Sequence, residues 1–197
     1  MIYLLVTVRG MLSINVSAHG KRPGFLKKNF IDLALECDMQ DVSIDSTIIK
    51  VHQAVGSKKK ESIGKSRGGN TTKVHVAVDA LGNPLKVKLT GGQVHDVTVA
   101  ANLIADLKPD IIMADAAYDS DKLREQIASL GSTACIKPRR NRKVFISFDK
   151  EQYKERYLVE CFFQKLKHYR RIATRYDKLA KRFLAFIHLA CILIWLL

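Results

Sequence analysis

Cysteine is scarce and widely spread in this sequence, which excludes the protein classes that cysteine holds together. The four cysteines lie far apart and form no Cys-x-x-Cys pair. This spacing fits neither the disulfide framework of a small secreted domain nor a structural zinc site. We therefore expect reduced thiols, as in a cytosolic protein.

Long apolar runs are lacking as well. Residues 183–197 are strongly apolar, but this run is shorter than the roughly 20 residues that a spanning helix needs, and it contains His188. Residues 1–8 lack the basic start and the cleavage site of a signal peptide. We predict that the C-terminal run forms an apolar helix in the core or against a partner and makes no membrane contact.

Acidic residues are few relative to basic ones. Nineteen Asp and Glu stand against 33 Lys and Arg, which gives a formal net charge of +14. Such an excess favours a polyanionic partner, and nucleic acid is the usual one, although an anionic membrane surface would give the same number. The apolar fraction of 47% is that of a folded domain and excludes intrinsic disorder.

The apolar periodicity predicts an α/β fold. Alternating or fully apolar segments predict strands at 42–47, 73–79, 85–89, 110–115 and 133–136. Helical spacing predicts helices at 25–37, 97–107 and 120–130, and from residue 150 onward with a break near 174–177. Residues 1–24 show no clear period, and residues 56–72 predict a mobile basic loop. The order of elements indicates a mixed sheet with helices on both faces.

Two acids close predicted strands. Asp45 and Asp115 each stand at such an end, where open α/β sheets place their ligands. A helix cap or a solvated edge is the alternative for either acid taken alone. Asp119 and Asp121 enter the next predicted helix and are interpreted as caps, and Asp79 is interpreted as a turn residue.

A third acid lies on a predicted helix. Tyr153, Arg156, Glu160 and Lys167 are separated by three, four and seven residues, so at about 3.6 residues per turn they form one stripe. For this helix alone, a solvated face with an ordinary Arg–Glu pair is the better explanation.

These residues resemble a known family. The spacing of Tyr153, Arg156, Glu160 and Lys167 resembles the Y-R-E-K signature of bacterial insertion-sequence transposases of the DDE type. The segments 44–47 and 114–119 resemble the blocks that carry the first and second acids, and 65–73 and the pair His95-Asp96 are also similar to that group. The resemblance implies a ribonuclease-H-like mixed sheet flanked by helices.

The resemblance also implies a mechanism. Asp45, Asp115 and Glu160 are the implied catalytic residues and ligands of two divalent ions, Mg²⁺ or Mn²⁺, with Asp45 as the bridging ligand. Carboxylate oxygens suit such hard ions, and two ions activate the attacking and leaving oxygens of a phosphodiester.

DNA is the implied partner. Tyr153, Arg156 and Lys167 are expected to grip the transposon end, and further basic residues are expected to contact phosphates. These are Arg67, Lys73, Arg139 and Arg140, together with the lysines at 58–60. A homodimer on DNA is expected, because two ends are joined in one event, and nucleoid association in the cytoplasm follows.

We expect residues 25–197 to form the catalytic domain and leave residues 1–24 unassigned. Because relatives carry a larger N-terminal part that recognises the inverted repeats, we expect the downstream portion of a longer or frameshifted transposase. Two alternatives stay open: a truncated remnant that binds DNA without transposing it, and a membrane-surface protein. The second does not explain the ordered acid blocks.

Overall fold

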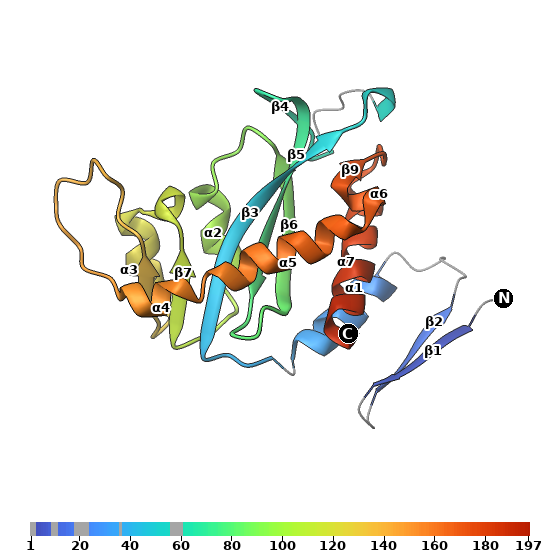
Figure 1. Cartoon of the computed structure of the whole chain (residues 1–197), viewed down its shortest axis with the longest axis horizontal. Helices are drawn as coiled ribbons and strands as arrows, with labels where there is room; N and C mark the ends of the chain where they lie inside the picture. The colour runs from blue at the N-terminus through green and yellow to red at the C-terminus, as the bar shows by residue number, and fades with distance from the viewer. Residues whose placement is uncertain (1–2, 9–11, 18–23, 36, 56–60) are drawn as a thin grey trace.

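The structure is a computed structural model that describes residues 3–8, 12–17, 24–35, 37–55 and 61–197. β1 (Tyr3–Val8) and β2 (Leu12–Ser17) pair in antiparallel fashion as a separate two-stranded sheet (Figure 1). The sequence analysis assigned no element to this stretch. The missed signal is the alternation of apolar and polar residues over 12–17, which is typical of a strand.

The main sheet has seven strands and is mixed. Its strands are β3 (Asp41–Val51), β4 (Gly64–Ser66), β5 (Gly69–Val78), β6 (Pro84–Gly91), β7 (Ile111–Ala114), β8 (Thr133–Ile136) and β9 (Thr174–Arg175). The predicted strands and the hairpin of β5 and β6 are confirmed. β3 is longer than predicted, however, and the segment predicted as a loop over 56–72 contains β4 and the start of β5.

β3 is the central strand of this sheet. It pairs antiparallel with β5 on one side. On the other side it pairs in parallel with β7 at its start and with β9 at its end. β8 extends the sheet in parallel beyond β7. The β-branched residues of β3 (Val42, Ile44, Thr47, Ile48 and Ile49) favour this extended, half-buried position.

Seven helices flank the sheet in the described part of the chain. They are α1 (Phe25–Ala34), α2 (Val97–Ile104), α3 (Asp121–Ser129), α4 (Lys150–Lys154), α5 (Tyr157–His168), α6 (Arg170–Ala173) and α7 (Ala180–Leu196). The two 3-10 turns are η1 (Gln53–Val55) and η2 (Ala116–Tyr118). The break predicted near 174–177 is confirmed, because β9 separates α6 from α7.

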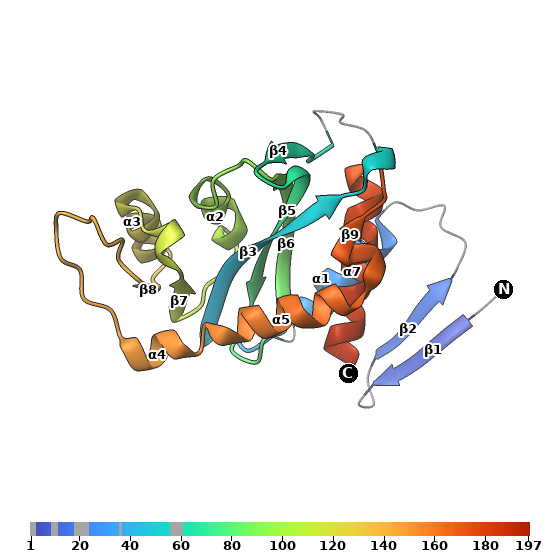
Figure 2. The same cartoon turned by 45° about the horizontal axis from the view of Figure 1, so that its top comes forward.

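Two apolar cores lie on opposite faces of the sheet. Alternate residues of a strand point to opposite faces. Ile44 and Ala77 therefore pack in the core under α2 and α3, whereas Ile49 and Val76 pack in the core under α1, α5 and α7. Figures 1 and 2 show α5 lying across the sheet on the second of these faces. The prediction of a mixed sheet with helices on both faces is confirmed.

The apolar C-terminal run forms α7. Its buried residues join the core with α1 and α5, and the indole Nε1 of Trp195 donates a hydrogen bond of 2.8 Å to the carbonyl of Pro84 in β6. α7 is thus a core helix, as predicted. Among the described residues, none of the helices combines the length and the apolar character that a bilayer crossing requires.

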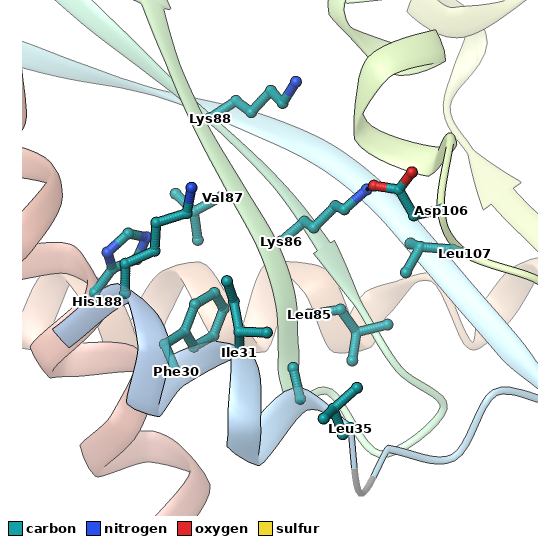
Figure 3. A pocket seen from close by; sticks show the side chains of 12 residues that line it. Phe30, Ile31, Leu35, Leu85, Lys86, Val87, Lys88, Asp106, Leu107 and His188 are labelled. Atoms are coloured by element: carbon teal, nitrogen blue, oxygen red, sulfur yellow. Dashed lines mark hydrogen bonds and ion pairs between the residues drawn. The ribbon is translucent and has the colours of Figure 1, made fainter. Parts of the chain in front are cut away.

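His188 of α7 is a buried histidine whose protonation would destabilise the folded state. Its ring stacks on Phe30 at 5.2 Å between centroids, at the edge of a hollow of about 410 Å³ between α1 and β6 (Figure 3). Burial, and secondarily the charge of Lys27, lowers the pKa of His188 from 6.5 to about 4. The neutral ring therefore stabilises the folded state above the unfolded pKa, and this stability is lost as the pH falls toward 4.

We expect His188→Phe to reduce the acid sensitivity of folding. Phenylalanine keeps the stacking on Phe30 but takes up no proton, so wild type should lose about 2 kcal/mol more than the variant between pH 7 and pH 4. Urea denaturation at both pH values measures this difference. A parallel loss in both proteins contradicts the prediction. The exposed His168 supplies the control substitution, His168→Phe.

Candidate active site

Asp45 and Asp115 lie side by side because of strand register. The parallel pairing of β3 with β7 ends where Ser43 lies opposite Met113, and both acids follow two residues later on their own chains. The charge of Asp115 acts on Asp45, so the two carboxylates lie near one another. Backbone N–H groups hold both carboxylates: Ser46 donates to Asp45 Oδ1 at 2.7 Å, and Ala117 donates to Asp115 Oδ1 at 2.9 Å. Asp45 thus lies within β3, whereas Asp115 directly follows the last residue of β7 and begins η2.

The prediction that Asp45 closes its strand is wrong, since β3 continues to Val51. What ends beside Asp45 is the neighbouring strand. β7 pairs with β3 over 41–43 and β9 over 50–51, so on this side none of the described strands pairs with the segment between them. Asp45 therefore has an open flank although it lies within a strand.

Arg156 joins the third acid to the first. Its Nη1 lies 3.0 Å from Asp45 Oδ2, and its Nη2 donates to Glu160 Oε1. Glu160 lies in the first turn of α5 and is half exposed, at 54% of its side chain. The guanidinium group thus lies between two of the three predicted acids.

The predicted stripe runs over two helices instead of one. Tyr153 lies on α4, Arg156 is the N-cap of α5, and Glu160 and Lys167 lie on α5; Figure 2 shows α4 and α5 end to end. The Arg156 guanidinium carbon lies 5.7 Å from the centroid of the Tyr153 ring. Lys167 is exposed about 10 Å further along the helix, given a rise of 1.5 Å per residue. Tyr153, Arg156 and Glu160 are therefore close, while Lys167 lies away from them.

Burial disfavours the charged form of Asp45. Burial, together with the nearby Asp115 and Asp96, raises its pKa from 3.8 to about 6, although the Ser46 N–H and Arg156 act in the opposite direction. With a folded-state pKa above the unfolded value, the contribution of Asp45 to stability is present below about pH 4. It is lost as the pH rises through 6.

We expect Asp45→Asn to stabilise the metal-free protein at neutral pH. Asparagine carries no charge, and its amide oxygen can still accept from Arg156, so the gain at pH 7.5 should be about 2 kcal/mol. At pH 4 the two proteins should be nearly equal, because Asp45 is then protonated. Urea denaturation in the presence of EDTA measures the gain. If Asp45→Asn is less stable than wild type at both pH values, the prediction is wrong.

Asp96 is a residue near the site to which the sequence analysis gave no role. Its Oδ1 accepts a hydrogen bond of 2.6 Å from Ser46 Oγ and lies 3.1 Å from Lys73 Nζ and 3.6 Å from His75 Nδ1. Ser46, Lys73 and His75 share the sheet face opposite to Asp45. The pair His95-Asp96, resembling the family, was the available signal. Asp96 thus supports β3 directly behind Asp45.

The prediction that Lys73 contacts DNA needs correction. Lys73 is 8% exposed, and its ammonium group donates to the Val94 carbonyl at 2.8 Å besides pairing with Asp96. A buried and partnered ammonium group is not presented to a phosphate. Lys73 therefore stabilises the start of α2 against β5.

The remaining predicted DNA contacts differ in their surroundings. Arg67, in the turn between β4 and β5, and Arg140 are exposed. Arg139 is exposed too, but its guanidinium group donates to the carbonyls of Ala116 and Ala117 at 3.1 and 3.2 Å. The lysines at 58–60 lie outside the described residues.

Asp79 and Asp119, two acids that the sequence analysis set aside as turn or cap residues, have different partners. Asp79 accepts from the N–H groups of Leu81 and Asn83, which confirms the predicted turn role. Asp119 does not cap α3: its carboxylate is buried and accepts from Arg124 and Arg142. The N-cap of α3 is Ser120.

The donor chemistry of the site suits a hard cation. Asp45, Asp115 and Glu160 offer carboxylate oxygens. The pKa of Asp45 is raised mainly by burial and secondarily by Asp115 and Asp96, so a cation would stabilise its charged form. Across the described ranges, no three or more His, Cys, Asp or Glu side chains are already gathered in a metal-binding arrangement. The guanidinium group of Arg156 lies between the carboxylates of Asp45 and Glu160, in the space that a cation bound by both would need.

A mixed α/β sheet with one acid on β3, a second directly after the adjacent parallel strand β7 and a third on the helix across the sheet defines a ribonuclease-H-like domain. The comparison with known families gives the particular group. Residues 36–195 match the model of the Transposase DDE domain, and the chain belongs to this family. It is thus a DDE transposase, an enzyme class that cleaves DNA and transfers its strands.

Individual relatives agree with this assignment. The chain is 50% identical over 128 residues to a candidate transposase for insertion sequence element IS6501 from Brucella ovis, covering 64% of this chain and 98% of that protein. It is 32% identical over 135 residues to a candidate transposase for insertion sequence element IS402 from Burkholderia cepacia, and the match covers 62% of each. This chain thus spans about three fifths of the second relative.

Among solved structures, the piggyBac transposase in a synaptic complex with hairpin DNA is similar, with a TM-score of 0.55 and 12% identity. The match covers 85% of this chain and 48% of that one. At this identity the likeness shows the fold alone, and the fold agrees with the ribonuclease-H-like prediction.

Proposed function

We propose that this chain cleaves DNA at the ends of an insertion sequence and transfers the freed strands into target DNA, with Asp45, Asp115 and Glu160 as its catalytic residues. The observation that carries the proposal is the strand register that sets Asp45 beside Asp115, with Arg156 linking Asp45 to Glu160.

We propose that these three acids hold two divalent ions, Mg²⁺ or Mn²⁺. Asp45, Asp115 and Glu160 would supply the carboxylate oxygens that hold these ions. When bound, such ions activate the attacking oxygen and stabilise the leaving oxygen of the phosphodiester. Glu160 is the most exposed of the three acids, so it is the one whose side chain can turn toward Asp45 once Arg156 releases it.

Arg156, Tyr153 and Lys167 are the proposed contacts to the transposon end, with Arg67 and Arg140 as further phosphate contacts. The exposure of Lys167, Arg67 and Arg140 and the net charge of +14 support this role, whereas Tyr153 and Arg156 are partly buried beside the acids. Arg156 already carries two ion pairs with acids. Binding of a phosphate would therefore exchange one anionic partner of Arg156 for another.

We propose residues 25–197 as the catalytic domain, since Phe30 and Leu33 of α1 lie in the same core as α5 and α7. A homodimer on DNA and a place at the nucleoid of the bacterial cytoplasm complete the proposal. Joining two transposon ends in one event requires two active sites, which is the reason for the dimer.

The test is a cleavage assay with the whole chain. Labelled duplexes that carry the DNA flanking the coding sequence are incubated with the protein and Mg²⁺, Mn²⁺ or EDTA. We expect nicking at the element boundary with either ion and none with EDTA. Binding of the duplexes without nicking under any condition would overturn the proposal and favour the remnant that binds DNA without transposing it.

A further inference from the structure

Asp119 is the centre of a buried polar cluster next to the site. Only 4% of the residue is exposed. Its Oδ1 accepts from Arg124 Nη2 and from Arg142 Nη1, each at 2.9 Å, and its Oδ2 accepts from the backbone N–H of Arg139 at 2.9 Å. One carboxylate thus joins the start of α3 to the connector that follows β8.

The side chain of Arg139 extends from this cluster to the turn that carries Asp115. Nε donates to the carbonyl of Ala116 at 3.1 Å, and Nη2 donates to the carbonyl of Ala117 at 3.2 Å. Both carbonyls belong to η2. The N–H of Ala117 in turn donates to Asp115 Oδ1 at 2.9 Å. An unbroken series of hydrogen bonds therefore leads from Asp119 through Arg139 and η2 to Asp115.

Topology explains why these distant residues meet. β7 and β8 are parallel, and Ala114 lies opposite Ile136. The chain leaves both strands at the same edge of the sheet, which places the connector after β8 against η2. Arg124 fixes this arrangement further, since its Nη2 also donates to the Ile136 carbonyl at 2.9 Å.

We propose that Asp119 and Arg139 are positioning residues for Asp115. They hold η2 so that the Asp115 carboxylate stays near Asp45 when a cation binds. The short β7 ends at Ala114, so the sheet itself does not restrain Asp115. This inference rests on the proposed role of Asp115 as a metal ligand, and it gives Arg139 an internal role in place of a DNA contact.

Arg139→Gln and Arg140→Gln form a matched pair for the test. Both remove one positive charge, at neighbouring positions, but only Arg139 donates to η2 in the described structure. Three quantities are compared with wild type: the dissociation constant for Mn²⁺, from the electron paramagnetic resonance of free Mn²⁺; the Kd for duplex DNA as a function of salt; and the cleavage rate at saturating DNA.

For Arg139→Gln we expect Mn²⁺ binding about tenfold weaker, as is typical when a group that orients a metal ligand is lost, together with slower cleavage at saturating DNA. Its DNA affinity and salt dependence should match wild type. For Arg140→Gln we expect unchanged Mn²⁺ binding and weaker DNA binding, with a salt slope smaller by about one. Arg139→Lys, with a single ammonium group, should lie between wild type and Arg139→Gln.

Weaker DNA binding by Arg139→Gln with wild-type Mn²⁺ affinity would overturn the proposal, because Arg139 would then be a phosphate contact. Unchanged values in both assays would overturn it as well. Asp119→Asn is a second variant, expected to weaken Mn²⁺ binding like Arg139→Gln. If it does not fold, Arg139→Gln decides alone.

The Mn²⁺ measurement needs no cleavage and therefore separates this inference from the proposed function. If wild type binds Mn²⁺ but cleaves no DNA, the proposed function fails, and Arg139→Gln still tests the positioning of Asp115. If wild type cleaves DNA and both variants behave alike, the positioning role fails alone.

Discussion

Asp45→Asn and Glu160→Gln are each expected to reduce metal-dependent DNA cleavage by at least about a thousandfold. Either substitution removes a charged oxygen ligand, and the stabilisation that metal ions give to the transition state amounts to several kcal/mol, at about 1.4 kcal/mol per factor of ten. Single-turnover cleavage of a duplex with the element boundary, in Mg²⁺ and in Mn²⁺, measures the loss.

Matched controls separate this loss from a general effect of charge. Asp106→Asn and Glu151→Gln remove equivalent carboxylates that are exposed and pair only with surface lysines in the described structure. They should cleave at nearly the wild-type rate. Duplex binding by Asp45→Asn should be retained. Substantial cleavage by either active-site variant, or an equal loss in the controls, would show that the acids do not act as ligands.

The same Asp45 substitution is expected to raise stability while it removes activity. The charge that the site requires is disfavoured by its own burial, which is the reason for the raised pKa of Asp45. Residues that hold a strained or buried charge for function commonly lower stability. A destabilised Asp45→Asn would instead mean that its carboxylate mainly anchors Arg156.

The sequence predicted most strands of the sheet, but it predicted neither the full extent of the strand that carries Asp45 nor the neighbours of that strand. Alternation and apolar runs identified β3, β5, β6, β7 and β8, because each strand has one or two buried faces. The length of β3 was underestimated because Ile48 and Ile49 are consecutive apolar residues followed by Lys50, which breaks the alternation of the preceding residues. That Asp45 stands beside Asp115 depends on register, which only pairing between distant strands sets.

The surroundings of the acids were less predictable. Lys73, Asp96 and Arg139 each have partners at least 20 positions away in sequence, apart from neighbours along their own elements. Composition and spacing identify Lys73 and Arg139 as basic residues but give no information on whether a phosphate or a carbonyl accepts from them. A family resemblance transfers the acids themselves but leaves such supporting contacts to the three-dimensional structure.

Arg175→Met is expected to destabilise the fold by about 3–5 kcal/mol. Arg175 is fully buried in β9, and burial lowers the pKa of its guanidinium group from the ordinary value. The group donates to Thr72 Oγ1 at 2.7 Å and to the carbonyls of Asp177 and Lys178, and it lies 5.2 Å from the centroid of the Phe183 ring. Methionine fills the space but leaves these buried acceptors without a donor.

The contacts of Arg175 explain why this loss should reach the active site as well. β9 pairs with the end of β3, which carries Asp45, and Thr72 lies in β5, the neighbour of β3. Arg175 therefore links α7 to β5 and, through β9, to the strand of Asp45. Thermal unfolding should show a decrease in Tm of about 10 °C for Arg175→Met, given roughly 2–4 °C per kcal/mol for a chain of this size. The exposed Arg182 of α7 supplies the control, Arg182→Met, for which we expect no more than about 0.5 kcal/mol. An Arg175→Met protein as stable as wild type would mean that water satisfies these acceptors and that packing alone holds α7 to the sheet.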